Sequence, residues 1–407
     1  MNVIFVEPFF PKNQREFVRA LHSVGARVVG VGEYPFDAFD DDLKGWLYHY
    51  EQVSSVVNEE AMARTVRWIQ ERLPIDRLEA TVEAHIMAAA RIREACGIPG
   101  TSARTAFLCR DKPAMKEVLR QAGVPTAASI GAKSPNDAWS FVQEHGYPII
   151  VKPRDGAGAA GTYKCTNDPE LQHAISESGL QQGRSVAIEE FIEGHEGFYD
   201  TITIDGRVVH EFATHYYPNV LEAMRTRWIS PQFITTNRID TAEGYSEVKE
   251  MGRKVIEALG IGTSATHMEW FFGPKGLKFA EIGCRPPGVR CWDLYAHGNE
   301  MDIYVEWAMA IVHGKSAQRA SRRYAAGIVA LRADRDGVID RYDGLEEVQS
   351  RFGEFIIDYH LPSPGSPAGT VEGGYMSGAW IRMKHTDYDE LRKMLDTVGQ
   401  MVKVKAR

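Results

Sequence analysis

The chain has 407 residues, of which 44% are hydrophobic and 25% are charged, and its formal net charge is −8. This is the composition of a globular protein with two to four subdomains, and no apolar run reaches membrane-spanning length. The negative charge argues against nucleic acid as a partner.

The five cysteines form no CxxC pair, and no basic residues precede the apolar N-terminal segment. We therefore expect free thiols, no signal peptide and a cytoplasmic location.

The N-terminal pattern predicts a β-α-β unit, with strands at residues 2–6 and 26–31 around a helix at 13–24. Such a unit indicates a parallel sheet. A helix at 58–72, a strand at 77–82 and a helix at 85–96 continue the α/β alternation. Glu83 directly follows the predicted strand at 77–82 and so lies at its carboxyl end, where open α/β sheets hold ligand groups. A carboxylate at a helix N-terminus is the alternative interpretation of Glu83.

A glycine-rich hairpin dominates the middle of the chain. A helix at 112–122, a strand near 129 and a helix at 135–145 lead into an apolar strand that ends at Lys152. The loop that follows contains Gly156, Gly158 and Gly161, and small residues let backbone N–H groups approach an anion. The loop is not a P-loop, because no Gly-Lys-Ser/Thr runs from it into a helix. An ordinary glycine-rich turn is the alternative.

The C-terminal half alternates hairpins with single helices. The predicted elements are a strand at 185–191, a hairpin at 199–204 and 207–215, a helix at 244–259, a hairpin at 266–272 and 276–282, a helix at 301–313, strands at 326–332, 355–360 and 378–383, and a helix at 387–400. The order of strands and helices indicates a further mixed sheet region after about residue 324.

Two carboxylates lie on opposite strands of the 266–282 hairpin. Counting from the turn, Glu269 is about level with residues 277–279 and Glu281 lies slightly further out, so the two side chains share a face. Two carboxylates on one covered face need a cation, and Mg²⁺ commonly takes one or two protein carboxylates. Arg285 follows, fixed by Pro286 and Pro287, and can stabilise charge on a transferring phosphoryl group. A solvent-facing glutamate pair and a structural salt bridge are the alternatives.

This order of motifs resembles the ATP-grasp superfamily, to which biotin carboxylase, D-alanine–D-alanine ligase and the L-amino acid ligases belong. The resembling features are a lysine before a glycine-rich hairpin, the segment Glu-Glu-Phe-Ile-x-Gly-x-Glu, and a late Glu…Glu-x-x-x-Arg. The resemblance implies an α/β protein with the ATP-grasp fold. Its expected parts are a Rossmann-like parallel-sheet domain (1–100), a linker helix with the lid subdomain (101–187), a catalytic subdomain (188–315) and a small mixed C-terminal region (316–407).

The resemblance also implies roles for individual residues. Lys112 and Lys152 would meet the phosphates of ATP, and Lys152, His267 and Arg285 would be catalytic. A histidine of the core is the alternative interpretation of His267. The remaining ATP-binding residues would be Gly156, Gly158, Gly161, Glu189, Glu190, Phe191, Ile192 and, at the ribose, Glu196. Glu269 and Glu281 would hold Mg²⁺ or Mn²⁺. Many members carry Asn two residues after the second glutamate, whereas this chain has Gly283, which leaves one or two metal ions open.

The implied reaction is ATP-dependent ligation of a carboxylate and an amine through an acyl phosphate. The partners would be small molecules of these two classes, and a homodimer is compatible with the resemblance. Candidate substrate contacts are Glu83, Arg225, Arg227, Trp228 and Arg290. A biotin-carboxylase-like or purine-pathway ligase is one alternative. A nucleotide-binding regulator without activity is another, although retention of the whole residue set argues against it.

Overall fold

A parallel four-stranded sheet forms the N-terminal part of the computed structural model, which describes residues 1–156, 161–288, 290–370, 375–376 and 378–407. Its strands, in the order β3-β2-β1-β4, are β3 (Leu47–Gln52), β2 (Arg27–Gly32), β1 (Asn2–Val6) and β4 (Arg77–Glu79). The predicted β-α-β start is confirmed.

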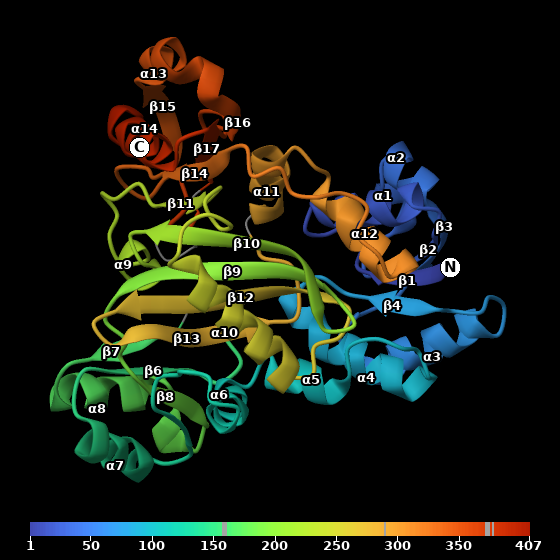
Figure 1. Cartoon of the computed structure of the whole chain (residues 1–407), viewed down its shortest axis with the longest axis horizontal. Coiled ribbons are helices and arrows are strands. Elements are labelled where there is room, and N and C mark those ends of the chain that lie inside the picture. The colour runs from blue at the N-terminus through green and yellow to red at the C-terminus, as the bar shows by residue number, and fades with distance from the viewer. Residues whose placement is uncertain (157–160, 289, 371–374, 377) are drawn as a thin grey trace.

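The strand β1 is buried on both faces, as expected in a parallel sheet. Ile4 and Val6 pack into the cluster that contains α3 (Glu59–Gln70) and α4 (Ile86–Cys96). Val3 and Phe5 pack on the other side, with α1 (Gln14–Ser23) and the distant α12 (Ile303–His313). The alternation follows from the period of two along a strand, and it ties the N-terminal sheet to the rest of the molecule (Figure 1).

An eight-stranded sheet with antiparallel pairing forms the centre of the molecule. In spatial order its strands are β13 (Gly276–Gly283), β12 (Ser264–Gly273), β9 (His195–Ile204), β10 (Arg207–Tyr217), β11 (Gln232–Thr235), β14 (Ala325–Leu331), β17 (Ala379–His385) and β16 (Ile356–His360). Both predicted hairpins are present. The three predicted C-terminal strands, β14, β17 and β16, join this sheet, whereas β15 (Ile339–Asp343) and β18 (Lys403–Ala406) form a separate two-stranded antiparallel sheet.

A second antiparallel sheet lies below β12 and β13 in Figure 1. Its order is β5 (Ser129–Ala132), β8 (Val186–Glu190), β6 (Ile149–Pro153) and β7 (Tyr163–Cys165), and its apolar side chains pack with those of α7 (Pro135–His145) and α8 (Asp168–Glu177). The helix α6 (Lys112–Gln121) connects this lobe to the N-terminal part, and the Asp111 side chain caps it by accepting from Ala114 N–H.

Several elements were not predicted from the sequence. They are the helices α2 (Asp41–Trp46), α5 (Ala103–Leu108), α8, α9 (Val220–Ala223), α11 (Cys291–Asn299) and α13 (Leu345–Phe352), the short 3₁₀ turns Phe36–Ala38, Glu83–His85, Leu180–Gln182 and Gly353–Phe355, and the strands β3, β11, β15 (Ile339–Asp343) and β18 (Lys403–Ala406). Most are short. In α11 the buried residues include Trp292, Tyr295 and Asn299, so the helix lacks the polar face that reveals an amphipathic pattern.

The remaining helices are α10 (Tyr245–Ala258) and α14 (Tyr388–Met401), both close to their predicted bounds. Within the described ranges, no helix has both the length and the apolar composition that a membrane span requires.

Candidate active site

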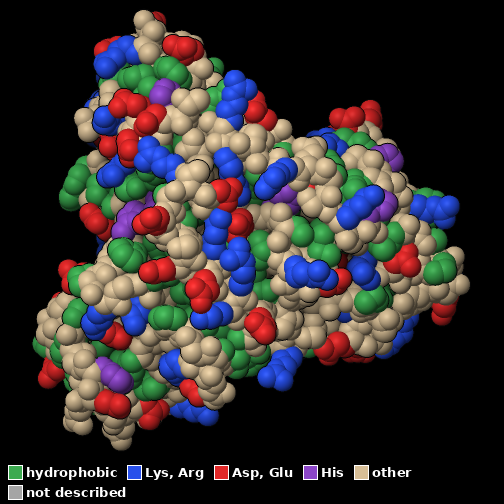
Figure 2. All heavy atoms as spheres, viewed as in Figure 1, with side chains coloured by type: hydrophobic (Ala, Val, Ile, Leu, Met, Phe, Trp, Pro, Cys, Tyr) green, Lys and Arg blue, Asp and Glu red, His purple; other side chains and the backbone are tan. Residues whose placement is uncertain are grey.

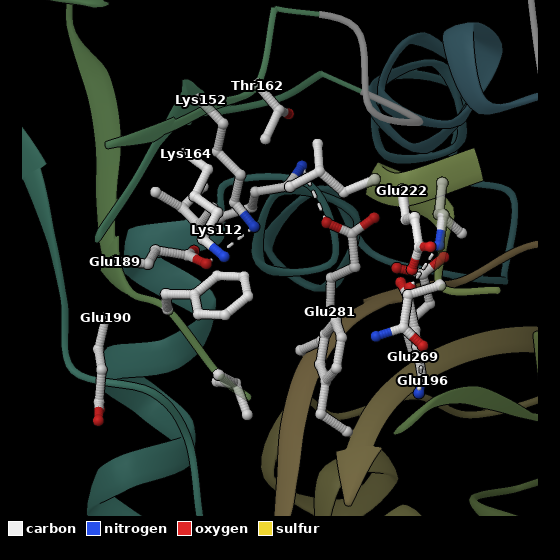
Figure 3. Close-up of a pocket in the computed structure, with 18 of the residues that line it drawn as sticks. Lys112, Lys152, Thr162, Lys164, Glu189, Glu190, Glu196, Glu222, Glu269 and Glu281 are labelled. Carbon is white, nitrogen blue, oxygen red and sulfur yellow. Dashed lines mark hydrogen bonds and ion pairs between the residues drawn. The ribbon is translucent and has the colours of Figure 1, made fainter. Parts of the chain in front are cut away.

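A cavity of about 450 Å³ lies between the β5–β8–β6–β7 sheet and the β12–β13 hairpin (Figure 3). Charged side chains reach it from α6, β6, β8, β9, β12 and β13. Its charged lining residues are Lys112, Lys116, Lys152, Lys164, Glu189, Glu190, Glu196, Glu222, Arg225, Glu269 and Glu281. The cavity therefore brings together most of the residues singled out for ATP and metal binding.

Two lysines share one buried carboxylate in this cavity. The Nζ atoms of Lys116 and Lys152 lie 2.7 and 2.8 Å from the two oxygens of Glu189. Burial alone would raise the pKa of Glu189, but the two ammonium groups outweigh it and lower that pKa to about 2. Burial lowers the pKa of Lys116 to about 8, whereas Glu189 and Glu281 overcome burial and raise the pKa of Lys152. Lys152 is therefore a firmly charged group in the cavity.

Lys112 lies at the first position of α6 and links three parts of the site. Its Nζ lies 3.2 Å from an oxygen of Glu281, and both residues are labelled in Figure 3. The same Nζ donates to the carbonyl oxygen of Gly156 at 2.6 Å. Asp111, which caps α6, also accepts from Arg154 at the end of β6 at 2.8 Å. These contacts join α6, the start of the glycine-rich loop and β13. Burial opposes ionisation of Glu281, but Lys112 and Lys152 lower its pKa.

Glu269 and Glu281 are direct cross-strand partners on β12 and β13. The two side chains share one face, as predicted, although the sequence count placed Glu281 slightly further out than Glu269. A register shift between Glu269 and Trp270 adds one residue on β13 and brings the two level. Within the described ranges no group of three or more acidic, His or Cys side chains could hold a metal ion. The pair still fits Mg²⁺, which completes its shell with phosphate oxygens and water.

Glu196, at the start of β9, is buried beside the carboxylate pair. It accepts from the backbone N–H of Val220, at the start of α9, at 2.7 Å. Burial and the nearby Glu269 raise the pKa of Glu196 to about 8. The contact fixes the segment around Val220 against the cavity wall.

The predicted adenine-reading segment at the end of β8 also lines the cavity. Phe191 and Ile192 contribute apolar surface, and Lys164 on β7 lies over the Phe191 ring with its Nζ 3.8 Å from the centroid. Glu190 instead forms an ion pair with Lys275 in the β12–β13 turn. The segment therefore bridges the two sheets that enclose the cavity.

Arg285 follows β13 and forms an ion pair with Glu83, with its Nε 2.6 Å from a carboxylate oxygen. Arg110 contacts the other oxygen of Glu83 at 3.1 Å. Burial opposes the charge on Arg285, but Glu83 raises its pKa. A side chain at Gly283 would place its Cβ 3.3 Å from Glu83 and 3.5 Å from Arg285. The glycine that departs from the family pattern therefore makes room for this ion pair.

His267 on β12 is held in a charged state by a buried carboxylate. Its Nδ1 lies 2.7 Å from Asp200 on β9, which also accepts from the Tyr295 hydroxyl of α11. Although burial opposes protonation, Asp200 raises the pKa of His267 to about 9. The second ring nitrogen, Nε2, lies 3.6 Å from Glu269. His267 is thus an imidazolium directed at the carboxylate pair.

The predicted substrate contacts divide among three cavities. Arg225 lines the main cavity and donates to the carbonyl oxygen of Thr162 at 3.3 Å. Arg227 and Trp228 do not reach it; they line a separate cavity of about 280 Å³ whose other walls include Lys403 and Lys405.

Glu83 and Arg290 line a third cavity, on the side of Arg285 that faces the N-terminal sheet. Of the glycines in the loop, Gly158 lies outside the described residues, and Gly161 has a φ of +68°, which favours glycine.

The sequence reasoning missed Lys116, Asp200, Asn219 and Glu222. Lys116 had a signal, because it lies four residues after Lys112 and so shares its helix face. Asp200 had none, because its partners His267 and Tyr295 are distant in the sequence. Glu222 lies on the four-residue helix α9 and Asn219 directly precedes it, and this short helix was not predicted from the sequence.

Comparisons with known proteins find similar sequences and similar folds. Residues 117–300 match the ATP-grasp domain family. The chain is 28% identical over 249 residues to the L-arginine-specific L-amino acid ligase of Bacillus subtilis, covering 60% of this chain and 59% of that protein. It is 35% identical over 211 residues to D-alanine–D-alanine ligase B of Clostridium perfringens, covering 49% and 65%. The chain thus spans less than two thirds of the length of each of these relatives.

The crystal structure of an L-amino acid ligase from Bacillus licheniformis has the same fold. The TM-score is 0.77 at 18% sequence identity, and the match covers 100% of this chain and 98% of that one. Together, the N-terminal parallel sheet, the two antiparallel sheets around the cavity and the family match show that this chain has the ATP-grasp fold and that its residues 117–300 form an ATP-grasp domain.

Proposed function

We propose that the protein is an ATP-dependent carboxylate–amine ligase that acts on amino-acid-like substrates. The observation that carries the proposal is the cavity in which Lys112 and Lys152 face the paired carboxylates of Glu269 and Glu281. A cavity with cations on one wall and a carboxylate pair on another suits a nucleoside triphosphate together with a divalent ion. The amino-acid class of substrate is supported by the likeness to the L-arginine-specific ligase.

The chemistry needs mainly positioning and charge neutralisation. A substrate carboxylate attacks the γ-phosphorus of ATP and gives an acyl phosphate and ADP; an amine then attacks the acyl carbon and releases phosphate as the amide forms. Mg²⁺, when bound by Glu269 and Glu281, supplies further neutralisation of phosphate charge. Lys152 and Lys112 would bind phosphate oxygens and keep the nucleotide in line.

Arg285 and His267 would act at the reacting centre. Arg285 offers a planar guanidinium that donates through Nε to Glu83 and through Nη1 to the carbonyl oxygen of Pro286, and its Nη2 would donate to the acyl phosphate oxygens. His267 carries a positive charge beside Glu269 and would stabilise negative charge in the same region. Glu83, held between Arg110 and Arg285, lies where an ammonium group of an amino acid would find a carboxylate.

The test is ADP release measured against a panel of amino acids, singly and in pairs, with product masses determined by mass spectrometry. We expect ADP to appear only when a carboxylate substrate is present, and a new amide when an amine is added. A Glu281→Gln variant is the matched negative control, and circular dichroism checks its fold. Nucleotide binding without ADP release for any acid and amine would instead favour the regulator without activity.

A further inference from the structure

A cavity of about 570 Å³ lies beside the proposed reacting centre, between the N-terminal sheet and the segment after β13. Its walls come from residues 11–16 before and within α1, residues 81–83 after β4, and residues 285–288 and 290. Four cationic side chains line it, against two carboxylates: Lys12, Arg15, Arg285 and Arg290 against Glu16 and Glu83. The cavity is large enough for an amino-acid-sized molecule, and Arg285 is one of its lining residues.

The two carboxylates already have partners of their own. Glu83 contacts both Arg285 and Arg110, and Glu16 contacts Arg19 at 2.8 Å. Arg15 is likewise engaged, with Asp40 at 2.5 Å. These groups are therefore compensated without a ligand.

Lys12 and Arg290 are the cations with charge left over. Among the described residues no ion pair is found for Lys12, which is exposed. In the part of the chain that the structure describes, Arg290 forms an ion pair only through its Nε, 2.6 Å from Asp293, and Asp293 is shared with Arg382 at 2.7 Å and with the Tyr304 hydroxyl. The terminal nitrogens of the Arg290 guanidinium thus remain available for an acidic group.

The local backbone structure also supports a site for an acidic group at Arg290. Arg290 has a φ of +60°, a conformation that residues with side chains rarely adopt and that occurs preferentially at functional sites. Arg290 directly precedes α11, and Asn13 directly precedes α1; neither caps its helix with a side chain. Both helix N-termini lie at this cavity, and their partial positive charge adds to that of Lys12 and Arg290.

We propose that this cavity binds the carboxylate substrate and that the substrate carries a second anionic group, a carboxylate or a phosphate, held by Lys12 and Arg290. The inference rests on the proposed ligase function, because the reacting carboxylate is placed at Arg285. The distal group then extends toward the start of α1 and α11. Lys12 and Arg290 are specificity residues in this arrangement and take no part in phosphoryl transfer.

Matched ligand pairs test the proposal by calorimetric titration of the protein loaded with Mg²⁺ and a non-hydrolysable ATP analogue. Glutamate is compared with glutamine, and O-phosphoserine with serine, so that the two arms distinguish a carboxylate from a phosphate. We expect the acidic member of at least one pair to bind about tenfold more tightly or better. Lys12→Gln and Arg290→Gln should each remove most of this preference and leave the affinity for the ATP analogue unchanged.

Arg323→Gln is the control, because Arg323 is about as exposed as Arg290, at 59% against 53%, and pairs with Glu300 elsewhere. The proposal is overturned if Lys12→Gln and Arg290→Gln both keep the preference for the acidic ligand. It is also overturned if the neutral ligand of each pair binds the wild-type protein as tightly as the acidic one. Measurement of ADP release separates the two hypotheses. Release without preference for acidic substrates refutes this inference alone, whereas a wild-type protein that releases no ADP with any acid and amine refutes the proposed function.

Discussion

Replacement of Lys152 by alanine tests the nucleotide site most directly. Lys152 lies at the end of β6, and its Nζ contacts Glu189 at 2.8 Å. A hydrogen bond to a charged group contributes about 1.5–3 kcal/mol, so loss of the phosphate contact should weaken nucleotide binding by about 10- to 150-fold. The fold should persist, because Glu189 keeps Lys116 at 2.7 Å. We expect the free energy of unfolding to fall by about 1–3 kcal/mol, which is less than the ~3–5 kcal/mol lost when a buried charge loses its only partner.

The assay is calorimetric titration with Mg·ADP and Mg·ATP, with chemical denaturation to measure the free energy of unfolding. Lys254→Ala is the matched control, because Lys254 is an exposed lysine on α10 that contacts only Glu250 at 2.9 Å. An affinity in Lys152→Ala equal to that of the control would refute the assignment. A variant that unfolds would refute the argument that Lys116 compensates Glu189.

Three further predictions concern the carboxylate pair and its surroundings. Glu269→Gln and Glu281→Gln should each lower turnover strongly, with Glu281→Gln less rescued by added Mg²⁺; wild-type turnover in both variants, measured by phosphate release, would remove the metal site. Asp200→Asn should lower the pKa of His267 from about 9 toward its ordinary value. The ion pair of protonated His267 with Asp200 stabilises the folded state fully at pH values below the pKa of histidine in the unfolded chain, and this stabilisation is lost as the pH rises through about 9. The difference in free energy of unfolding between wild type and variant, measured by denaturation, should therefore shrink over that pH range. Gly283→Asn should reduce kcat more than it changes Mg·ADP affinity, because the new side chain presses on the ion pair beside it; unchanged kinetics would contradict that packing.

Local patterns predicted the parts of the site that lie within one hairpin or one helix turn. The face shared by Glu269 and Glu281 follows from strand alternation around a recognisable turn. The helix start at Lys112 follows from the Asp111 cap, whereas the role of Lys112 at a phosphate was implied only by the family resemblance. The register shift between Glu269 and Trp270 was not predictable, because a bulge depends on how β12 also pairs with β9.

Contacts between distant segments could not be predicted from the sequence. Glu83 meets Arg285 only because the N-terminal sheet packs beside the end of β13, and the loop residues Arg227 and Trp228 turn toward the C-terminal strand β18 instead of the main cavity. Surface charge gave no guide either, since positive and negative side chains are interspersed over the face in Figure 2. The order of the central sheet, in which β14 pairs with β11 and β17, follows from tertiary packing and not from local propensity.

The ion pairs inside the main cavity have a thermodynamic consequence. Lys112 is engaged by Glu281, and Lys152 by Glu189, so the phosphates of a nucleotide in the proposed site would have to displace carboxylates from both lysines. A divalent ion bound to the Glu281 carboxylate would remove this competition, because Lys112 would then be released to bind phosphate. Metal and nucleotide should therefore favour each other's binding by the same factor, as linkage requires. Nucleotide without metal would instead face an unshielded carboxylate, which selects for the metal complex before any chemistry begins.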